Sequence, residues 1–356
     1  MKKINHIFHY KNSLIILYII FVVFNFVFFL YLKQEREDTI ANQDNVPFPV
    51  YDTAGIDTYM ENIDKYYVDY FPFKYNYISF SNILKAKVFH SLNSSNNVIV
   101  GKSGWLFYNA CVSDDLGMNE YAGYNKWDQD QLSKVARNIR TIERWCFAHH
   151  IKFELIICPN KQSIYSEYLP ECYKKRSDNR YDQLISVLPN TINIKKIFLD
   201  FRKKTNLPLY FKTDTHWNFF GAYLACNELN KRLKQQFPLN SFNQISLKSY
   251  SVNRGFDLAN MLALKDNYTD FMDSVGFKKP STYKIPHLVV LHDSYLSAME
   301  PSLNYMFAKI TQRHLYNDGM PTPEFLINSK ADVFVIELVE RYKELLTKDI
   351  PADFYK

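Results

Sequence analysis

Three short and almost wholly apolar runs limit the folds that are open to this chain. They are 153–159 (FELIICP), 287–291 (HLVVL) and 332–338 (DVFVIEL). A strand that is apolar on both faces must be covered on both faces, which is typical of parallel sheets. Two patterns of apolar residues at helical spacing accompany the runs, at 131–149 and at 219–233. Strands that alternate with helices predict an α/β fold with an open, mostly parallel sheet flanked by helices.

The remaining segments divide around this pattern. Residues 97–108 hold two short apolar runs separated by GKSG, which predicts a hairpin, and 191–201 is a further strand-like run. Residues 237–283 break the alternation, so we expect a covering insertion within one domain of 97–350. Residues 51–96 place aromatic and polar residues at largely helical spacing, which predicts an amino-terminal helical segment.

An uncharged run of twenty residues, 13–32, stands near the amino terminus, with Asn25 as its only strongly polar interruption. About twenty helical residues cross the ~30 Å hydrocarbon core of a membrane. Three lysines and no acid precede the run, whereas mixed charges follow it. The positive-inside rule therefore predicts an uncleaved transmembrane anchor, with a cytoplasmic tail at 1–12 and an exported linker at 33–50. A signal peptide would have a shorter core and an A-x-A-like site, and a buried core helix would not be apolar on every side.

Composition excludes several classes of protein. The chain is 47% hydrophobic and 22% charged, which is a globular balance. Its net charge of +6 is spread among interleaved acids and bases, without the basic block of a nucleic-acid arm, and a mildly basic face favours acidic polysaccharide or anionic lipid. The five cysteines are irregularly spaced and form no CxxC, so neither a zinc site nor a disulfide framework is indicated.

Two motifs carry candidate chemistry. Asp214 stands two residues before His216, so its carboxylate can accept from one ring nitrogen and leave the other nitrogen as a base. Ser294 directly follows the apolar run 287–291 and an aspartate, a position at the carboxyl edge of a parallel sheet where ligands collect. A serine needs such a base to become a nucleophile. The two motifs predict a triad of Ser294, His216 and Asp214, with the backbone N–H groups of Ser294 and Tyr295 as oxyanion donors.

Each motif also has a simpler interpretation. A D-x-H triplet is usually a surface turn, and an aspartate and a serine after a strand are usually a helix cap. Asp214, His216 and Asp293 are also possible metal ligands, but no further histidine or cysteine clusters with them, so we predict no metal site and no cofactor.

The order of several segments gives the sequence a recognisable pattern. These segments are 69–74 (DYFPFK), 98–108 (VIVGKSGWLFY), 159–161 (PNK), 165–170, 214–217 (DTHW), 221–222 (GA), 257–262 (DLANML), 293–295 (DSY) and 340–341 (ER). The pattern resembles the SGNH-hydrolase-like family of alginate O-acetyltransferases and related exopolysaccharide and cell-wall acetylation proteins, over most of 60–345. By matching position, the resemblance implies the same triad, Asp214, His216 and Ser294, within an SGNH-like catalytic domain. The serine motif of this chain, 292–294 (HDS), differs from the usual G-D-S of the family in having His292 in place of the glycine.

The resemblance also carries further expectations. Asn160 is the candidate for an oxyanion side chain, although a structural loop asparagine is the alternative. Trp217 is expected to pack in the core or to form a wall of the site, and Glu340 and Arg341 to be scaffold. The implied activity is O-acetylation of an exopolysaccharide or cell-wall glycan outside the cytoplasm of a bacterial cell. The implied acetyl donor is a multi-pass membrane-bound O-acyltransferase. The alternatives are a carbohydrate acetylesterase that uses the same triad and a non-catalytic, glycan-binding envelope scaffold.

Overall fold

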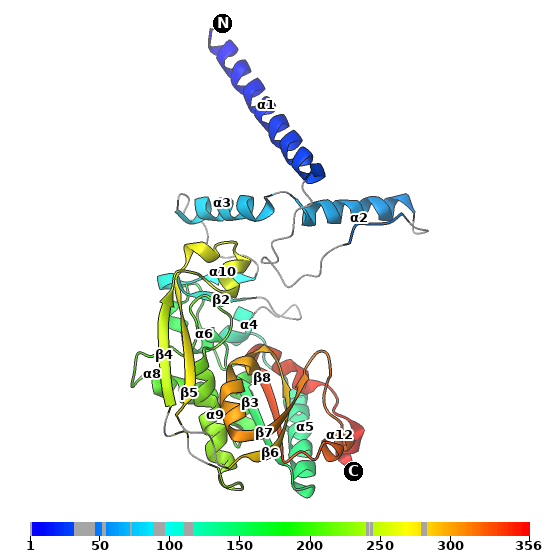
Figure 1. Ribbon diagram of the computed structural model, residues 1–356, viewed down its shortest axis with the longest axis vertical. Coiled ribbons are helices and arrows are strands. Elements are labelled where there is room, and N and C mark those ends of the chain that lie inside the picture. Colours follow the sequence, from blue (N-terminus) through cyan, green and yellow to red (C-terminus); the bar gives the residue numbers. More distant parts are fainter. Residues whose placement is uncertain are drawn as a thin grey trace. The chain divides into compact units, whose positions relative to one another are not determined.

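Figure 1 shows a computed structural model of the chain, which describes residues 2–31, 47–51, 55–71, 73–87, 97–109, 117–239, 242, 245–278 and 283–356. The chain forms two compact units. The larger one comprises Asn93–Ala259 and Lys265–Lys356, and the smaller one comprises Met1–Leu92 and Asn260–Leu264.

The larger unit is built on a parallel sheet of four strands in the order β3-β8-β6-β7 (Figure 1). The strands are β3 (Lys152–Cys158), β8 (Val333–Val339), β6 (Ile285–His292) and β7 (Phe307–His314). Three of them contain the predicted apolar runs, so the α/β fold with a parallel sheet is confirmed. Strand β7 was not predicted, because as an edge strand it has one neighbour and only its first residue is buried.

Helices cover both faces of this sheet. They are α5 (Gln129–Ala148), α7 (Arg180–Val187), α8 (Ile194–Arg202), α9 (Phe219–Leu233), α11 (Glu300–Met306) and α12 (Pro323–Asn328). Alternate residues of one strand enter two separate apolar clusters. Ile156 of β3 packs with α8 and α9, whereas Leu155 and Ile157 pack with α5, α7 and α12. This period of two is what a strand covered on both faces requires. The helix predicted at 219–233 and its Asn218 cap are both present.

The strand-like interpretation of 191–201 is wrong. The segment forms α8, which begins after Asn193, whose side chain accepts from the N–H of Lys196. Ile194 and Phe198 stand four residues apart and are both completely buried on one helix face. Only Ile192 contributes to the sheet, through an isolated parallel bridge with Ile156.

Shorter elements surround this core. The predicted hairpin consists of β1 (Val98–Val100) and β2 (Leu106–Tyr108), with Ser103 and Gly104 in the left-handed region of the turn. The expected insertion, 237–283, contains an antiparallel pair outside the parallel sheet, β4 (Ile245–Val252) and β5 (Asp270–Phe277). The other short helices are α4 (Gly117–Ala122), α6 (Lys161–Ile164), α10 (Asp257–Met261), η1 (Lys102–Gly104), η2 (Ser166–Tyr168), η3 (Lys265–Asn267), η4 (Ser294–Met299), η5 (Glu340–Thr347) and η6 (Ala352–Tyr355).

The smaller unit contains α1 (Lys2–Tyr31), α2 (Ile56–Asp69) and α3 (Lys74–Lys87). Asn25 of α1 is 1% exposed, and its amide oxygen accepts from the hydroxyl of Tyr77 at 3.4 Å. Within the part of the chain that the structure describes, no helix is both long enough and apolar enough to span a membrane. Most of the linker expected at 33–50 lies outside the described residues. The anchor and its orientation therefore stay predictions.

Candidate active site

The structure brings Asp214, His216 and Ser294 into one hydrogen-bonded row. Asp214 Oδ1 lies 2.8 Å from His216 Nδ1 and also accepts from the backbone N–H of His216 at 2.9 Å. On the other side of the ring, His216 Nε2 lies 2.8 Å from Ser294 Oγ. A carboxylate at Nδ1 favours the tautomer that carries its proton there, which leaves the lone pair of Nε2 to accept from the serine hydroxyl.

The electrostatics of Asp214 fit this arrangement. Burial raises the pKa of its carboxyl, but the hydrogen bonds from His216 outweigh burial and hold the pKa below its ordinary value. Asp214 is therefore an anion at neutral pH, and an anion at this place stabilises a positive charge on the imidazole.

Ser294 stands where β6 ends, at the first position of η4, and its side chain is exposed. The residue before it fixes this turn. Asp293 is 1% exposed, its Oδ1 accepts from Tyr295 N at 2.9 Å, and its Oδ2 accepts from Val339 N at 2.7 Å. The carboxylate thus ties the carboxyl end of β6 to that of β8 and presents the serine hydroxyl to solvent.

The predicted oxyanion donors differ in whether they are available to a ligand. The N–H of Tyr295 is not available, because it already donates to Asp293. The N–H of Ser294 donates to none of the residues that the structure describes, so its role stays a prediction. Asn160 is 3% exposed; its N–H donates to Glu340 at 2.8 Å, and its side-chain oxygen accepts from Arg341 at 3.1 Å. These bonds fix Asn160 through its backbone N–H and its side-chain carbonyl oxygen. Its role as an oxyanion side chain stays a prediction.

Trp217 is a core residue. It has no exposed area, and its indole N–H donates to the carbonyl oxygen of Tyr295 at 3.0 Å. A side chain without exposed surface cannot form a wall of an open site, so that expectation is corrected in favour of packing. The hydroxyl of Tyr295 in turn donates to the carbonyl of Thr215 at 2.7 Å, which joins the turn that carries Ser294 to the loop that carries His216.

Carboxylates accept from most of the backbone N–H groups in the histidine loop, 211–216. Asp270 accepts from the N–H groups of Lys212 at 3.1 Å and of Thr213 at 2.7 Å. Asp257 accepts from Thr215 N at 2.8 Å and from the Thr215 hydroxyl at 2.6 Å. Burial, and then the charge of Asp214, raise the pKa of Asp257 above its ordinary value.

Lys161 holds the carbonyl side of the same loop. Its ammonium is 2% exposed and donates to the carbonyl oxygens of Phe211, Lys212 and Asp214 at 3.1, 2.9 and 2.6 Å. An ammonium has three donors, and all three are used. Burial lowers the pKa of Lys161 to about 8, although Asp257 and Asp214 counteract it. No pattern in the sequence predicts a role for Lys161, Asp257 or Asp270. Lys161 and Asp257 belong to the segments 159–161 (PNK) and 257–262 (DLANML), but the spacing of these segments does not indicate that they contact the histidine loop.

A metal-binding alternative involves a different set of residues from the one expected. Possible ligand atoms of Asp214, His216 and Asp257 lie within 4.8 Å of one another. Asp293 does not belong to this group. One oxygen of Asp257 accepts from the N–H of Thr215 and the other accepts from the Thr215 hydroxyl, and both nitrogens of His216 already have partners. The contacts therefore fit a hydrogen-bonded triad better than a metal site.

Comparison with known proteins shows the family of the chain. The model of the family described as ALGX, an SGNH hydrolase-like domain of the acetyltransferase AlgX, matches residues 98–275, half of the chain. The chain belongs to this SGNH-hydrolase-like family. The resemblance inferred from the sequence motifs is thereby confirmed.

Individual relatives are more distant. The chain is 25% identical over 202 residues to the probable alginate O-acetylase AlgJ of Pseudomonas putida, which covers 54% of this chain and 49% of that protein. The match thus spans about half the length of this curated relative.

Two solved structures resemble the chain in fold. Bacillus cereus PatB1 matches with a TM-score of 0.50 at 14% identity, over 73% of this chain and 99% of PatB1. The O-acetyltransferase domain of P. putida AlgJ matches with a TM-score of 0.46 at 20% identity, over 73% of this chain and 95% of that domain. At these identities, the likeness to solved structures concerns the fold alone.

Proposed function

We propose that this chain is an O-acetyltransferase that moves an acetyl group through an acyl-serine on Ser294 to hydroxyl groups of an exopolysaccharide or cell-wall glycan. The main support is the row of contacts from Asp214 through His216 to Ser294, which ends in an exposed hydroxyl. Membership of an acetyltransferase family and the similarity to an alginate O-acetylase favour acetyl transfer to a polysaccharide.

The proposed reaction has two halves. In the first, Ser294 Oγ attacks the acetyl carbonyl of the donor while its proton passes to His216 Nε2. The bond to the leaving group then breaks, and that group takes the proton from Nε2. In the second, a sugar hydroxyl gives its proton to Nε2 and attacks the acetyl-serine, and Ser294 recovers the proton as its ester bond breaks. Asp214 stays ionised throughout and stabilises the imidazolium in both halves.

Two parts of the proposal concern the cell. The predicted anchor at 13–32 would hold the catalytic domain outside the cytoplasm at the bacterial plasma membrane. An exported domain has no direct access to a cytoplasmic acetyl donor. We therefore propose a multi-pass membrane-bound O-acyltransferase as the partner that delivers the acetyl group.

The test is formation of an acetyl adduct on Ser294. Incubation with p-nitrophenyl acetate should increase the mass of the intact protein by one acetyl group, and Ser294→Ala should show no increase. Ser297→Ala is the matched control, because Ser297 is also exposed and stands on the same short helix. An adduct on Ser294→Ala at the wild-type rate would exclude Ser294 as the nucleophile.

Hydrolysis is the second candidate activity, since the exposed Ser294 hydroxyl is within reach of water. It differs from transfer only in the acceptor. If added oligosaccharide leaves the release of acetate unchanged and becomes no more acetylated than in Ser294→Ala, the chain is an esterase.

A further inference from the structure

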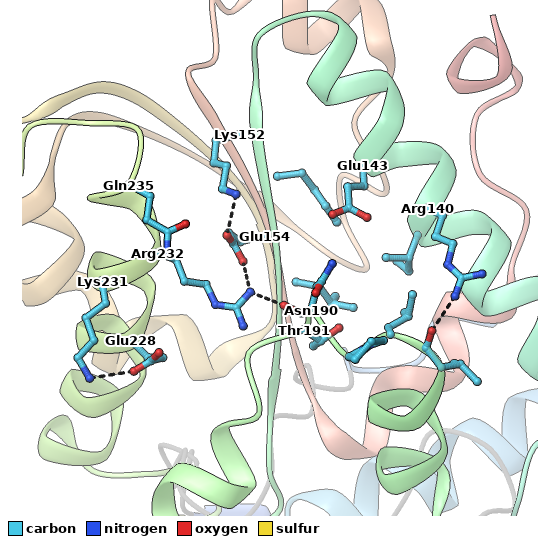
Figure 2. A pocket seen from close by; sticks show the side chains of 16 residues that line it. Arg140, Glu143, Lys152, Glu154, Asn190, Thr191, Glu228, Lys231, Arg232 and Gln235 are labelled. Atoms are coloured by element: carbon cyan, nitrogen blue, oxygen red, sulfur yellow. Dashed lines mark hydrogen bonds and ion pairs between the residues drawn. The ribbon is translucent and has the colours of Figure 1, made fainter.

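Three neighbouring cavities of the larger unit share lining residues on α5, and we call them together the α5 groove. The first, of about 630 Å³, lies between α5, β3 and α9 (Figure 2). The second, of about 1120 Å³, runs along α5 and α7, and the third, of about 450 Å³, surrounds the start of β3. Glu143 lines all three cavities, and Arg140 lines the first two.

Part of the α5 groove lies at the opposite edge of the sheet from the triad. It adjoins Lys152, the first residue of β3, whereas Ser294 follows the last residue of β6. Strands β3, β8 and β6 are mutually parallel, so their amino ends share one edge and their carboxyl ends share the other. A ligand in the groove therefore leaves the serine hydroxyl free.

Unpaired cations form one side of the groove. Arg137, Arg140 and Arg144 are exposed and stand at intervals of three and four residues, which puts them on one face of α5. Within the described part of the chain, no carboxylate lies within 4.0 Å of any of the three guanidinium groups. Arg140 instead donates to the carbonyl of Val187 at 2.9 Å, and Arg144 donates to the carbonyl of Arg140 at 3.3 Å and to the hydroxyl of Thr141 at 3.4 Å. Like charges at this spacing destabilise a helix. Three guanidinium groups held together without an anion indicate that the anion is supplied by a ligand.

The rest of the lining offers acceptors for hydroxyl groups and an apolar ring. Figure 2 shows Glu143 on α5, and Glu154 between Lys152 and Arg232, with both ion pairs at 3.3 Å. Phe147 continues the arginine stripe and is 84% exposed. An aromatic ring that is exposed beside polar groups suits an apolar face of a sugar ring.

We propose that the α5 groove binds a segment of an acidic polysaccharide, whose carboxylates pair with Arg137, Arg140 and Arg144. The guanidinium fork matches the geometry of a carboxylate, and the acceptors match sugar hydroxyls. That the bound polysaccharide is also the acetyl acceptor rests on the proposed function; the binding itself does not.

The experiment measures the affinity of the full chain for oligomers of galacturonate, glucuronate and mannuronate by calorimetry. The fully methyl-esterified galacturonate oligomer serves as the uncharged probe. The test variant is Arg137→Glu/Arg144→Glu. The control is Lys248→Glu/Lys309→Glu, which changes the net charge equally at exposed lysines outside the groove. Circular dichroism confirms that both variants are folded, and Ser294→Ala separates binding from catalysis.

We expect at least one acidic oligomer to bind, and the arginine variant to bind it about tenfold or more weakly, since two charge-assisted pairs are lost. The lysine control and Ser294→Ala should stay within about twofold of the wild type on the same scale. Equal loss in both charge variants overturns the proposal, as does equal affinity for the methyl ester or no binding of any acidic oligomer. Arginine-dependent binding only to phosphatidylglycerol vesicles would assign the groove to a membrane surface instead.

Discussion

The strongest prediction concerns Lys161, because one buried side chain satisfies three backbone carbonyls of the histidine loop. Lys161→Met keeps a flexible, unbranched side chain and removes every donor. Each carbonyl left without a partner costs about 1–3 kcal/mol, or roughly 6 kcal/mol for three at the middle of that range. The substitution also removes the cost of burying the ammonium. The pKa is lowered from 10.5 to about 8, which corresponds to about 3 kcal/mol. We therefore expect a loss of about 3 kcal/mol in the free energy of unfolding.

The same substitution should reduce activity, because the three carbonyls belong to the loop that positions Asp214 and His216. A displacement of about 1 Å in a catalytic group lowers a rate by about 100-fold. Urea denaturation gives the stability, and intact-mass kinetics with p-nitrophenyl acetate give the acylation rate of Ser294. Lys174→Met, at an exposed lysine, is the matched control. A folded Lys161→Met that loses less than about 1 kcal/mol and acylates within about twofold of the wild type would refute the reasoning, because the carbonyls would then have needed no buried donor.

Three other predictions follow from the contacts described. Asp214→Asn should lower the acylation rate of Ser294 by about 1000-fold or more, since an amide can donate to Nδ1 and favour the wrong tautomer of His216; a rate within tenfold of the wild type would contradict this. The stability advantage of the wild type over Lys161→Met should grow as the pH rises from about 8 toward 10.5. The folded pKa is the lower one, so the folded state loses its proton first and the burial cost fades; urea titrations whose difference stays constant over this window would count against it. Leu229→Ala, at a completely buried position of α9, should lower the free energy of unfolding by about 2–5 kcal/mol and leave the acylation rate of the folded protein unchanged; a loss below about 1 kcal/mol would show that the site is not tightly packed.

The sequence predicts those parts of the fold in which local pattern and tertiary packing agree. The strands β3, β6 and β8 are covered on both faces, so their apolar runs suffice to place them. The error at 191–201 shows the opposite case. Ile194 and Phe198 suit either a strand or a helix, and the decision rests on Asn193, which caps the helix. Strand β7 carries no apolar run, because it forms the edge of the sheet and most of its residues are exposed or half-buried.

The candidate site divides in the same way. Asp214 and His216 are two residues apart, and Ser294 follows a strand, so short-range pattern locates all three. The occupied N–H of Tyr295 was not foreseeable, since an Asp293 side chain can accept from the next residues or point elsewhere. The supports of the loop were missed for a different reason. Lys161 precedes the carbonyls that it binds by about fifty residues, a separation that only the fold specifies.

Contacts with the histidine loop and its surroundings link three short segments of the sequence, PNK, DLANML and ER. Lys161 donates to carbonyls of the histidine loop, and Asp257 accepts from the N–H and the hydroxyl of Thr215 in the same loop. Glu340 accepts from Asn160 N and from the Ser163 hydroxyl at 2.8 Å each, and so holds the turn from which Lys161 projects. The segments PNK, DLANML and ER are each too short to be informative alone, yet all three act on the orientation of His216. Replacing any one of them removes a contact of this loop or of the turn that carries Lys161, so we expect their effects on His216 to be non-additive.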